Sequence, residues 1–215
     1  CFWPYGYNSF HCDVTEQLKE GSNDIVVLLE NREQSSRWYP GAGLYRKVRH
    51  ITHPQVHVPV WGTYVTTPHI GKDYAVVSVR TKIEGIEKGS AVTLKTRILD
   101  AGGHAVACVT DTRLLHFGEI EQTLTVENPT LWSPESPVMY FVETEVYAGG
   151  SVNTDWNMDR PEISIADGTV PCDKVSTRFG FRTIEIIPDK GFFLNGEARK
   201  FRGVCLHHDL GPLGA

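Results

Sequence analysis

Two short stretches of the sequence combine side chains that could bind a polar ligand. The first, SSRWYPGAGLYRKV (residues 35–48), places Arg37 and Trp38 side by side in a turn shaped by a proline and two glycines. A guanidinium offers five donors to hydroxyls or carboxylates, and an indole offers a flat apolar face. The alternative is packing, in which the aromatic side chains fill a domain interface and Arg37 makes an ion pair there.

The second stretch, RGVCLHHD (residues 202–209), ends a predicted strand in two histidines and an aspartate. The imidazole of His207 can donate a hydrogen bond to a hydroxyl without carrying a full charge. The alternative is that His207 and Asp209 only cap the end of a strand. Because adjacent side chains on a strand point to opposite faces, His207 and His208 are poorly placed to share an ion, and we expect no metal site there.

The elements that must position these residues are strands. Period-two alternation dominates the middle of the chain, in DYAVVSVRTKI, AVTLKTRILD, EIEQTLTVE and VMYFVETEVY, and helical periodicity is scarce. Half-buried antiparallel strands have this pattern. Turn residues separate the runs: DAGGH (100–104) predicts a hairpin, and the proline-rich NPTLWSPESP (128–137) predicts an ordered connection. The sequence therefore predicts an all-β protein with a β-sandwich over residues 58–183, interrupted by a polar insertion at 149–173.

The segments on either side of this sandwich predict different units. Residues 1–57 contain three predicted strands, one of them the buried run DIVVLLEN, and a short helical turn in TEQLKEGSN. So few strands do not make a stable sandwich, and we expect this unit to be frayed or completed by other strands. Residues 184–215 begin with a hairpin whose turn is Asn195 and Gly196. Since the first residues resemble neither a natural start nor a signal peptide, we expect the chain to be a piece of a longer protein.

Composition excludes several classes of partner. The net charge of −5 and the absence of a basic block argue against nucleic acid or an anionic membrane surface. Apolar runs are strand-sized, far below the roughly 20 residues that cross a bilayer. Five cysteines without CxxC spacing predict buried thiols and leave the compartment open, although we expect a periplasmic or extracellular protein before a cytoplasmic one.

For two further groups of residues, a structural role explains the pattern better than ligand binding does. His50, His53 and His57 look like a metal triad, but an intervening proline breaks the helix that an i, i+4 pair would need, so we expect a solvated linker. Trp61 and Trp132 are expected in the sandwich core or at a domain interface rather than as ligand platforms.

Four stretches in order resemble glycoside hydrolase family 2, the family of β-galactosidases, β-glucuronidases and β-mannosidases. They are SRWYPGAGLYRKV, HVPVWGTYVTTP, NPTLWSPESPVMYF with RFGFRTIEI, and GFFLNGEARKFRGVCLHHDLGPLG. The resemblance implies the C-terminal part of a jelly-roll sugar-binding domain (1–57), an immunoglobulin-like β-sandwich (58–183) and the start of a (β/α)8 catalytic barrel (184–215). The RGVCLHHD form is most similar to bacterial β-galactosidase-like members.

The resemblance also implies a retaining β-glycosidase with two catalytic glutamates about 5–5.5 Å apart. The family carries both on later barrel strands, beyond residue 215, so we assign no catalytic residue here and expect this fragment to be inactive alone. It further implies that Arg37, Trp38, His207 and Asp209 contact the carbohydrate substrate. Arg37 stands where well-known β-galactosidases and β-glucuronidases have an aspartate, and Cys205 stands where many members have an asparagine.

The implied partners are a carbohydrate and the catalytic barrel of the same polypeptide. A homo-oligomer is compatible with the resemblance, as is magnesium bound elsewhere in the full-length protein, but we expect no cofactor in these residues. Two alternatives remain open: a non-catalytic carbohydrate-binding or surface-interaction β-sandwich module, and a purely structural spacer. A barrel with two glutamates downstream would distinguish the enzyme from both.

Overall fold

The structure is a computed structural model that describes the chain except for residues 7, 31, 35–42, 45, 149–168 and 205–215. The chain divides into two compact units, Thr52–Phe201 and Cys1–Ile51 with Arg202–Ala215. Apart from one 3-10 turn, η1 (Thr15–Gln17), the regular elements of the described residues are strands, so the prediction of an all-β protein is confirmed. Within those residues we find no helix with the length and apolar character to span a membrane. The boundaries at residues 57 and 183 stay predictions.

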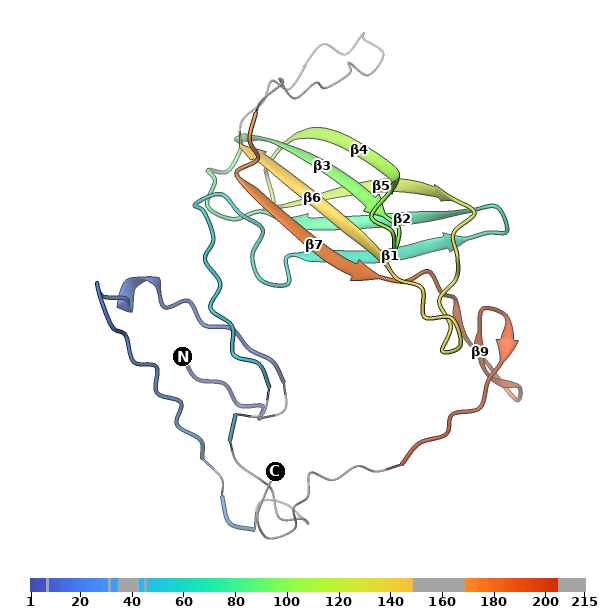
Figure 1. Cartoon of the computed structure of the whole chain (residues 1–215), viewed down its shortest axis with the longest axis horizontal. Helices are drawn as coiled ribbons and strands as arrows, with labels where there is room; N and C mark the ends of the chain where they lie inside the picture. Colours follow the sequence, from blue (N-terminus) through green and yellow to red (C-terminus); the bar gives the residue numbers. More distant parts are fainter. Residues whose placement is uncertain (7, 31, 35–42, 45, 149–168, 205–215) are drawn as a thin grey trace. The chain divides into compact units, whose positions relative to one another are not determined.

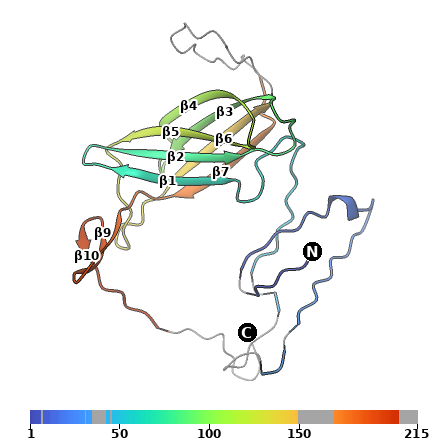
Figure 2. The same ribbon diagram turned by 180° about the vertical axis from the view of Figure 1, so that it is seen from behind.

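Seven strands of the unit Thr52–Phe201 form two antiparallel sheets (Figures 1 and 2). The three-stranded sheet has the order β1-β2-β5, with β1 at Thr63–Ile70, β2 at Tyr74–Lys82 and β5 at Glu119–Glu127. The four-stranded sheet has the order β4-β3-β6-β7, with β4 at Ala105–Leu114, β3 at Ala91–Leu99, β6 at Tyr140–Ala148 and β7 at Asp173–Phe179.

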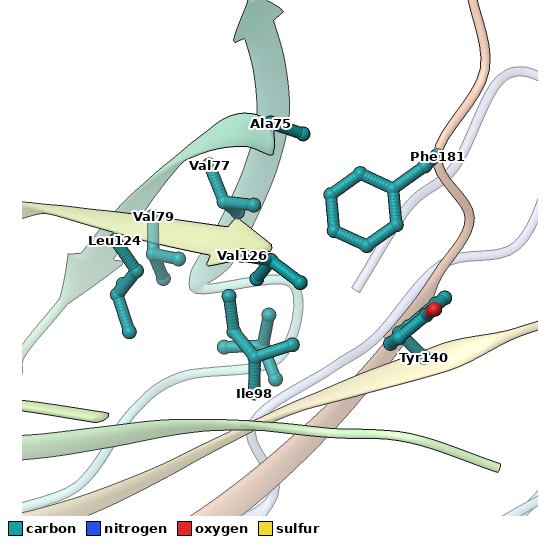
Figure 3. Close-up of a cluster of buried hydrophobic side chains, with 9 residues drawn as sticks. Ala75, Val77, Val79, Ile98, Leu124, Val126, Tyr140 and Phe181 are labelled. Carbon is teal, nitrogen blue, oxygen red and sulfur yellow. The ribbon is translucent and has the colours of Figure 1, made fainter. Parts of the chain in front are cut away.

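The core lies between the two sheets, on the faces that the sequence pattern predicts. Ala75, Val77 and Val79 of β2 are fully buried and pack in one cluster with Ile98 of β3 and Val142 of β6 (Figure 3). Each fully buried side chain of this size contributes roughly 1.5–3 kcal/mol relative to exposure, valine toward the lower end. The packing of these faces against each other makes the sandwich.

A buried polar bridge separates this cluster from a second one. Thr96, Thr144 and Gln122 occupy the inward positions between the two clusters on β3, β6 and β5. The Thr96 hydroxyl donates to Gln122 Oε1 at 2.6 Å and lies 3.1 Å from the Thr144 hydroxyl, and Gln122 Nε2 donates to the carbonyl oxygen of Leu94 at 3.3 Å. One glutamine side chain therefore bonds the two sheets across the core.

Two predicted turns are confirmed by their backbone geometry. DAGGH joins β3 to β4, with Asp100 N–H donating to the carbonyl of His104 at 2.9 Å. Asn195 (φ 52°) and Gly196 (φ 77°) form the two-residue turn of the second hairpin, where both residues need positive φ. This turn joins β9 (Gly191–Leu194) to β10 (Glu197–Ala198), and β8 (Ile184–Ile187) pairs with the other side of β9. The three strands form a small sheet of order β10-β9-β8, which we call the hairpin.

Several predictions about burial are wrong. The run at 24–30 forms no strand in the described residues and is exposed, with Leu28 at 94%, because no segment described there pairs with its backbone. The prediction of buried thiols also fails for Cys1, Cys12 and Cys108, which are exposed, Cys108 on the edge strand β4 opposite Arg97. Cys172 is half-buried, and its thiol donates to the carbonyl oxygen of Val146 at 3.0 Å. The predicted helical turn is present only as η1.

Candidate functional site

The four residues predicted to bind substrate, Arg37, Trp38, His207 and Asp209, lie outside the described residues. The structure instead describes how the chain reaches the second of the two candidate stretches. This approach consists of the connection 128–137, the residues after β7 and the hairpin β8-β9-β10, and we call it the junction. Its geometry sets where the chain leaves the sandwich at Phe201.

The proline-rich connection is anchored to the sandwich core. The backbone N–H of Trp132 donates to the carbonyl oxygen of Phe181 at 2.7 Å, beside a β-bridge between Leu131 and Phe181. Phe181 is fully buried, and its ring meets that of Tyr140 edge to face at 4.8 Å (Figure 3). The Tyr140 hydroxyl in turn accepts the N–H of Thr130 at 3.0 Å, so one aromatic pair fixes both chain segments.

Trp132 is clamped between two residues of the following segment. A Cβ added to Gly180 would lie 3.1 Å from the Cβ of Trp132, and the guanidinium of Arg182 lies 5.1 Å from the centre of the Trp132 ring. Glycine allows this close approach, since a Cβ here would require Trp132 to shift by a few tenths of an ångström. The cation adds a contact worth about 0.5–1 kcal/mol at such a site. Trp132 is half-buried by these contacts and belongs to neither core cluster, and Trp61 is 62% exposed with a φ of 60°. The prediction that they lie in the core is therefore wrong, and a place at a domain interface stays a prediction.

Asn195 joins the hairpin to this anchored connection. Its Nδ2 donates to the carbonyl of Trp132 at 3.0 Å, and its Oδ1 accepts the N–H of Thr183 at 3.0 Å. Its own N–H donates to the carbonyl of Thr183, also at 3.0 Å. The Asn-Gly signal predicts the turn but not the contact with Trp132, because that contact depends on a connection some sixty residues earlier in the chain.

An ion pair ties the second arm of the hairpin to the same connection. Arg199 contacts Glu135 at 2.6 Å and Glu197 at 3.1 Å. The hydrogen bond from Arg199 lowers the pKa of Glu135, and the bond to Glu135 raises the pKa of Arg199, so both groups are charged at neutral pH. Exposed pairs of this kind contribute little energy, but the pair defines the arm's direction. Sequence reasoning missed Arg199 and Glu135, since no local pattern links them.

The histidines at 50–57 are not a uniform solvated linker. His53 and His57 are half-buried, and their rings stack at 4.5 Å. His57 also forms a backbone bridge with Glu84, so the linker prediction is wrong for this part of the chain. Across the residues that the structure covers, no group of three or more His, Cys, Asp or Glu is arranged to hold a metal ion.

The described contacts of the junction are structural ones, which hold segments of the chain together. Arg199 pairs with Glu135 and Glu197, Arg182 lies over the Trp132 ring, and Phe181 packs in the core. Among the described residues, the junction thus holds the hairpin against the connection that precedes β6.

Comparison with known proteins gives consistent matches along this chain. Residues 56–159 match the model of glycosyl hydrolases family 2. A β-galactosidase of Bacteroides ovatus is 37% identical over 218 residues, which cover 99% of this chain and 23% of that protein. A Formosa agariphila protein provisionally named a β-glucuronidase is 36% identical over 212 residues, 98% of this chain and 18% of that protein.

A solved structure has a similar fold. The glycosyl hydrolase family 2 member from Bacteroides cellulosilyticus matches with a TM-score of 0.65 and 32% identity, over 85% of this chain and 23% of that one. The chain thus spans about a fifth of the length of the relatives it matches.

Proposed function

Because the chain belongs to glycoside hydrolase family 2, we propose that the complete protein is a β-glycosidase of the β-galactosidase-like type and that this chain supports its catalytic barrel. The observation that carries the proposal is the match to a β-galactosidase along 99% of the chain, at 37% identity. In the proposed mechanism, two glutamates outside these residues act as acid/base and nucleophile of a retaining reaction.

The sandwich is proposed to be the immunoglobulin-like domain of such an enzyme. Its strand order supports this assignment, because β1-β2-β5 facing β4-β3-β6-β7 resembles the two sheets of immunoglobulin-type sandwiches. Its proposed task is to hold the junction, and through it the stretch RGVCLHHD, at the mouth of the barrel.

Four residues are proposed to contact the sugar. Arg37 donates to substrate oxygens and Trp38 stacks on a pyranose face. His207 donates a hydrogen bond to a sugar hydroxyl, and Asp209 accepts one. These roles follow from the resemblance and from the residue types.

A β-glucuronide is the second candidate substrate. Arg37 favours it, because a guanidinium binds a carboxylate through two parallel hydrogen bonds, and such bonds are stronger than those to neutral hydroxyls. The name carried by the relative from Formosa agariphila agrees with this alternative.

The test uses the full-length protein with nitrophenyl β-galactoside and nitrophenyl β-glucuronide. Arg37→Ala is expected to lower kcat/KM about 10- to 100-fold on the true substrate, the cost of losing a hydrogen bond from a charged group, with an unchanged Tm. Arg32→Ala, which removes an exposed arginine paired with Glu30, is the matched control and should leave kcat/KM unchanged.

The outcomes separate the proposals. Hydrolysis of neither glycoside by the wild-type protein, together with sugar binding, would favour the non-catalytic module. Hydrolysis with unchanged kinetics in Arg37→Ala would remove the 35–48 loop from the substrate site. A loss confined to the glucuronide would identify the acidic sugar as the ligand of Arg37.

A further inference from the structure

Asn195 meets three separate demands at one position of the junction. Its φ of 52° lies in the left-handed region, which asparagine tolerates better than most residues. Its amide nitrogen donates to the Trp132 carbonyl, and its amide oxygen accepts from the Thr183 N–H. Glycine would meet only the first demand, and aspartate only the first and third.

The contacts of Asn195 reach the fully buried core. Trp132 is hydrogen-bonded to Phe181, which is fully buried against Tyr140. The path from the core to the hairpin turn therefore consists of two hydrogen bonds and one aromatic contact. These contacts join the hairpin turn to the sandwich core.

Further contacts along the second arm of the hairpin reach Phe201. The backbone N–H of Arg199 donates to the carbonyl oxygen of Phe192 at 2.9 Å, and the ring centres of Phe192 and Phe201 lie 4.5 Å apart. Phe201 stands six positions before His207 in the sequence, and an extended chain covers at most about 3.5 Å per residue. These contacts hold the described end of the hairpin, from which the stretch RGVCLHHD continues in the sequence.

We propose that Asn195 is a positioning residue, which fixes the hairpin on the sandwich and thereby sets the placement of the sugar-contacting stretch RGVCLHHD. This inference rests on the proposed function. Asn195 itself touches no substrate in this scheme. It acts on the rate, because a displacement of about 1 Å at a reacting centre can cost on the order of 100-fold in rate.

The test compares two glycine variants of the full-length protein. Asn195→Gly keeps the positive φ and removes both side-chain bonds. Asp189→Gly is the matched control, because Asp189 has a φ of 61° in the other turn of the same hairpin. We expect Asn195→Gly to lower kcat at least about 10-fold on the hydrolysed nitrophenyl glycoside, with a smaller change in KM, and Asp189→Gly to stay within about 2-fold.

Two further measurements separate positioning from simple stability. Hydrogen exchange of the backbone amides at 199–209 should accelerate in Asn195→Gly and not in Asp189→Gly. Asn195→Asp keeps the acceptor for Thr183 but turns a carboxylate oxygen toward the Trp132 carbonyl, so its activity should fall at least as far as that of Asn195→Gly. A lowered Tm with unchanged kcat and KM in Asn195→Gly would overturn the inference.

A wild-type protein without glycosidase activity would contradict the proposed function but not, by itself, the positioning role of Asn195. If the wild-type protein hydrolyses neither glycoside, the exchange experiment still decides the point. Equal exchange rates at 199–209 in Asn195→Gly and wild type would then overturn the positioning role, and faster exchange in Asn195→Gly alone would support it.

Discussion

At the scale of single residues, Gln122 is unusual because a long polar side chain is almost fully buried in a sandwich core. Its exposure is only 2%, and both ends of its amide are bonded to groups of β3. A satisfied polar group inside a core costs little, but losing one of its partners leaves a buried group unpaired. The bridge therefore fixes the register in which β5 faces β3.

Replacing Gln122 with leucine tests this bridge. Gln122→Leu keeps most of the volume but removes the acceptor of the Thr96 hydroxyl, and should lower the free energy of unfolding of the 215-residue chain by about 1–3 kcal/mol. Chemical denaturation measures this quantity. The double variant Thr96→Val with Gln122→Leu should recover part of the loss, and strictly additive losses would show that the two side chains are not coupled.

At the scale of elements, the sequence predicts strands well where alternation is uninterrupted. β2 and β3 follow their predicted faces throughout. β1 escapes the pattern because its register shifts between Thr66 and His69, around Pro68 in this edge strand. The junction also escapes, because the bonds of Asn195 and Arg199 join segments more than sixty residues apart. Local periodicity contains no information on such contacts.

Gly85 marks a second contact of this long-range kind. Its φ is 78°, and an added Cβ would lie 1.6 Å from the carbonyl oxygen of Gln55. The segment that contains His57 passes this closely because it is bridged to Glu84. Only glycine fits there, so this position fixes the segment before β1 against the end of β2.

Alanine at Gly85 should therefore be far more damaging than alanine at Gly89. Gly89 has a φ of 86° but open space around its Cβ position. Gly89→Ala carries only the strain of a left-handed alanine, about 1–2 kcal/mol. Gly85→Ala adds a backbone clash and should cost at least about 2 kcal/mol more, measured as the difference in unfolding free energy. Equal losses in the two variants would contradict the close approach.

At the scale of the whole molecule, the two units differ in how completely their sequence signals become structure. In Thr52–Phe201 the apolar faces of the two larger sheets pack against each other, whereas Ile184 and Ile186 of β8 are exposed. In Cys1–Ile51 the run at 24–30 has the composition of a buried strand, yet Val26 and Leu28 are exposed. Composition predicts the tendency to form a strand, but a strand also needs a neighbour for its backbone. For the same reason, residue types alone identify Arg37 and His207 as candidates without placing them.

The outer face of the four-stranded sheet bears a charge network that spans three strands. Arg97 of β3 pairs with both Glu143 and Glu145 of β6, and Lys174 of β7 pairs with the same two glutamates. The Tyr147 hydroxyl donates to Glu145 at 3.0 Å, and burial together with this bond raises its pKa. Cross-strand pairs of this type contribute roughly 0.2–1 kcal/mol each at neutral pH.

This network predicts how stability depends on pH. Burial alone would raise the pKa of Glu143, but hydrogen bonds from Lys174 and Arg97 outweigh it, and the net pKa lies below the ordinary value of 4.5. A carboxyl whose pKa is lower in the folded state stabilises the protein above its unfolded pKa, and the benefit is lost as the pH falls through the folded pKa. The unfolding free energy of the chain should therefore decrease on acidification from about pH 6 to pH 3.

Glu143→Gln should weaken that decrease, whereas Glu185→Gln, which removes an exposed carboxylate of β8, should leave the slope as in wild type. Parallel pH profiles for Glu143→Gln and wild type in urea denaturation would show that the network does not set the acid sensitivity.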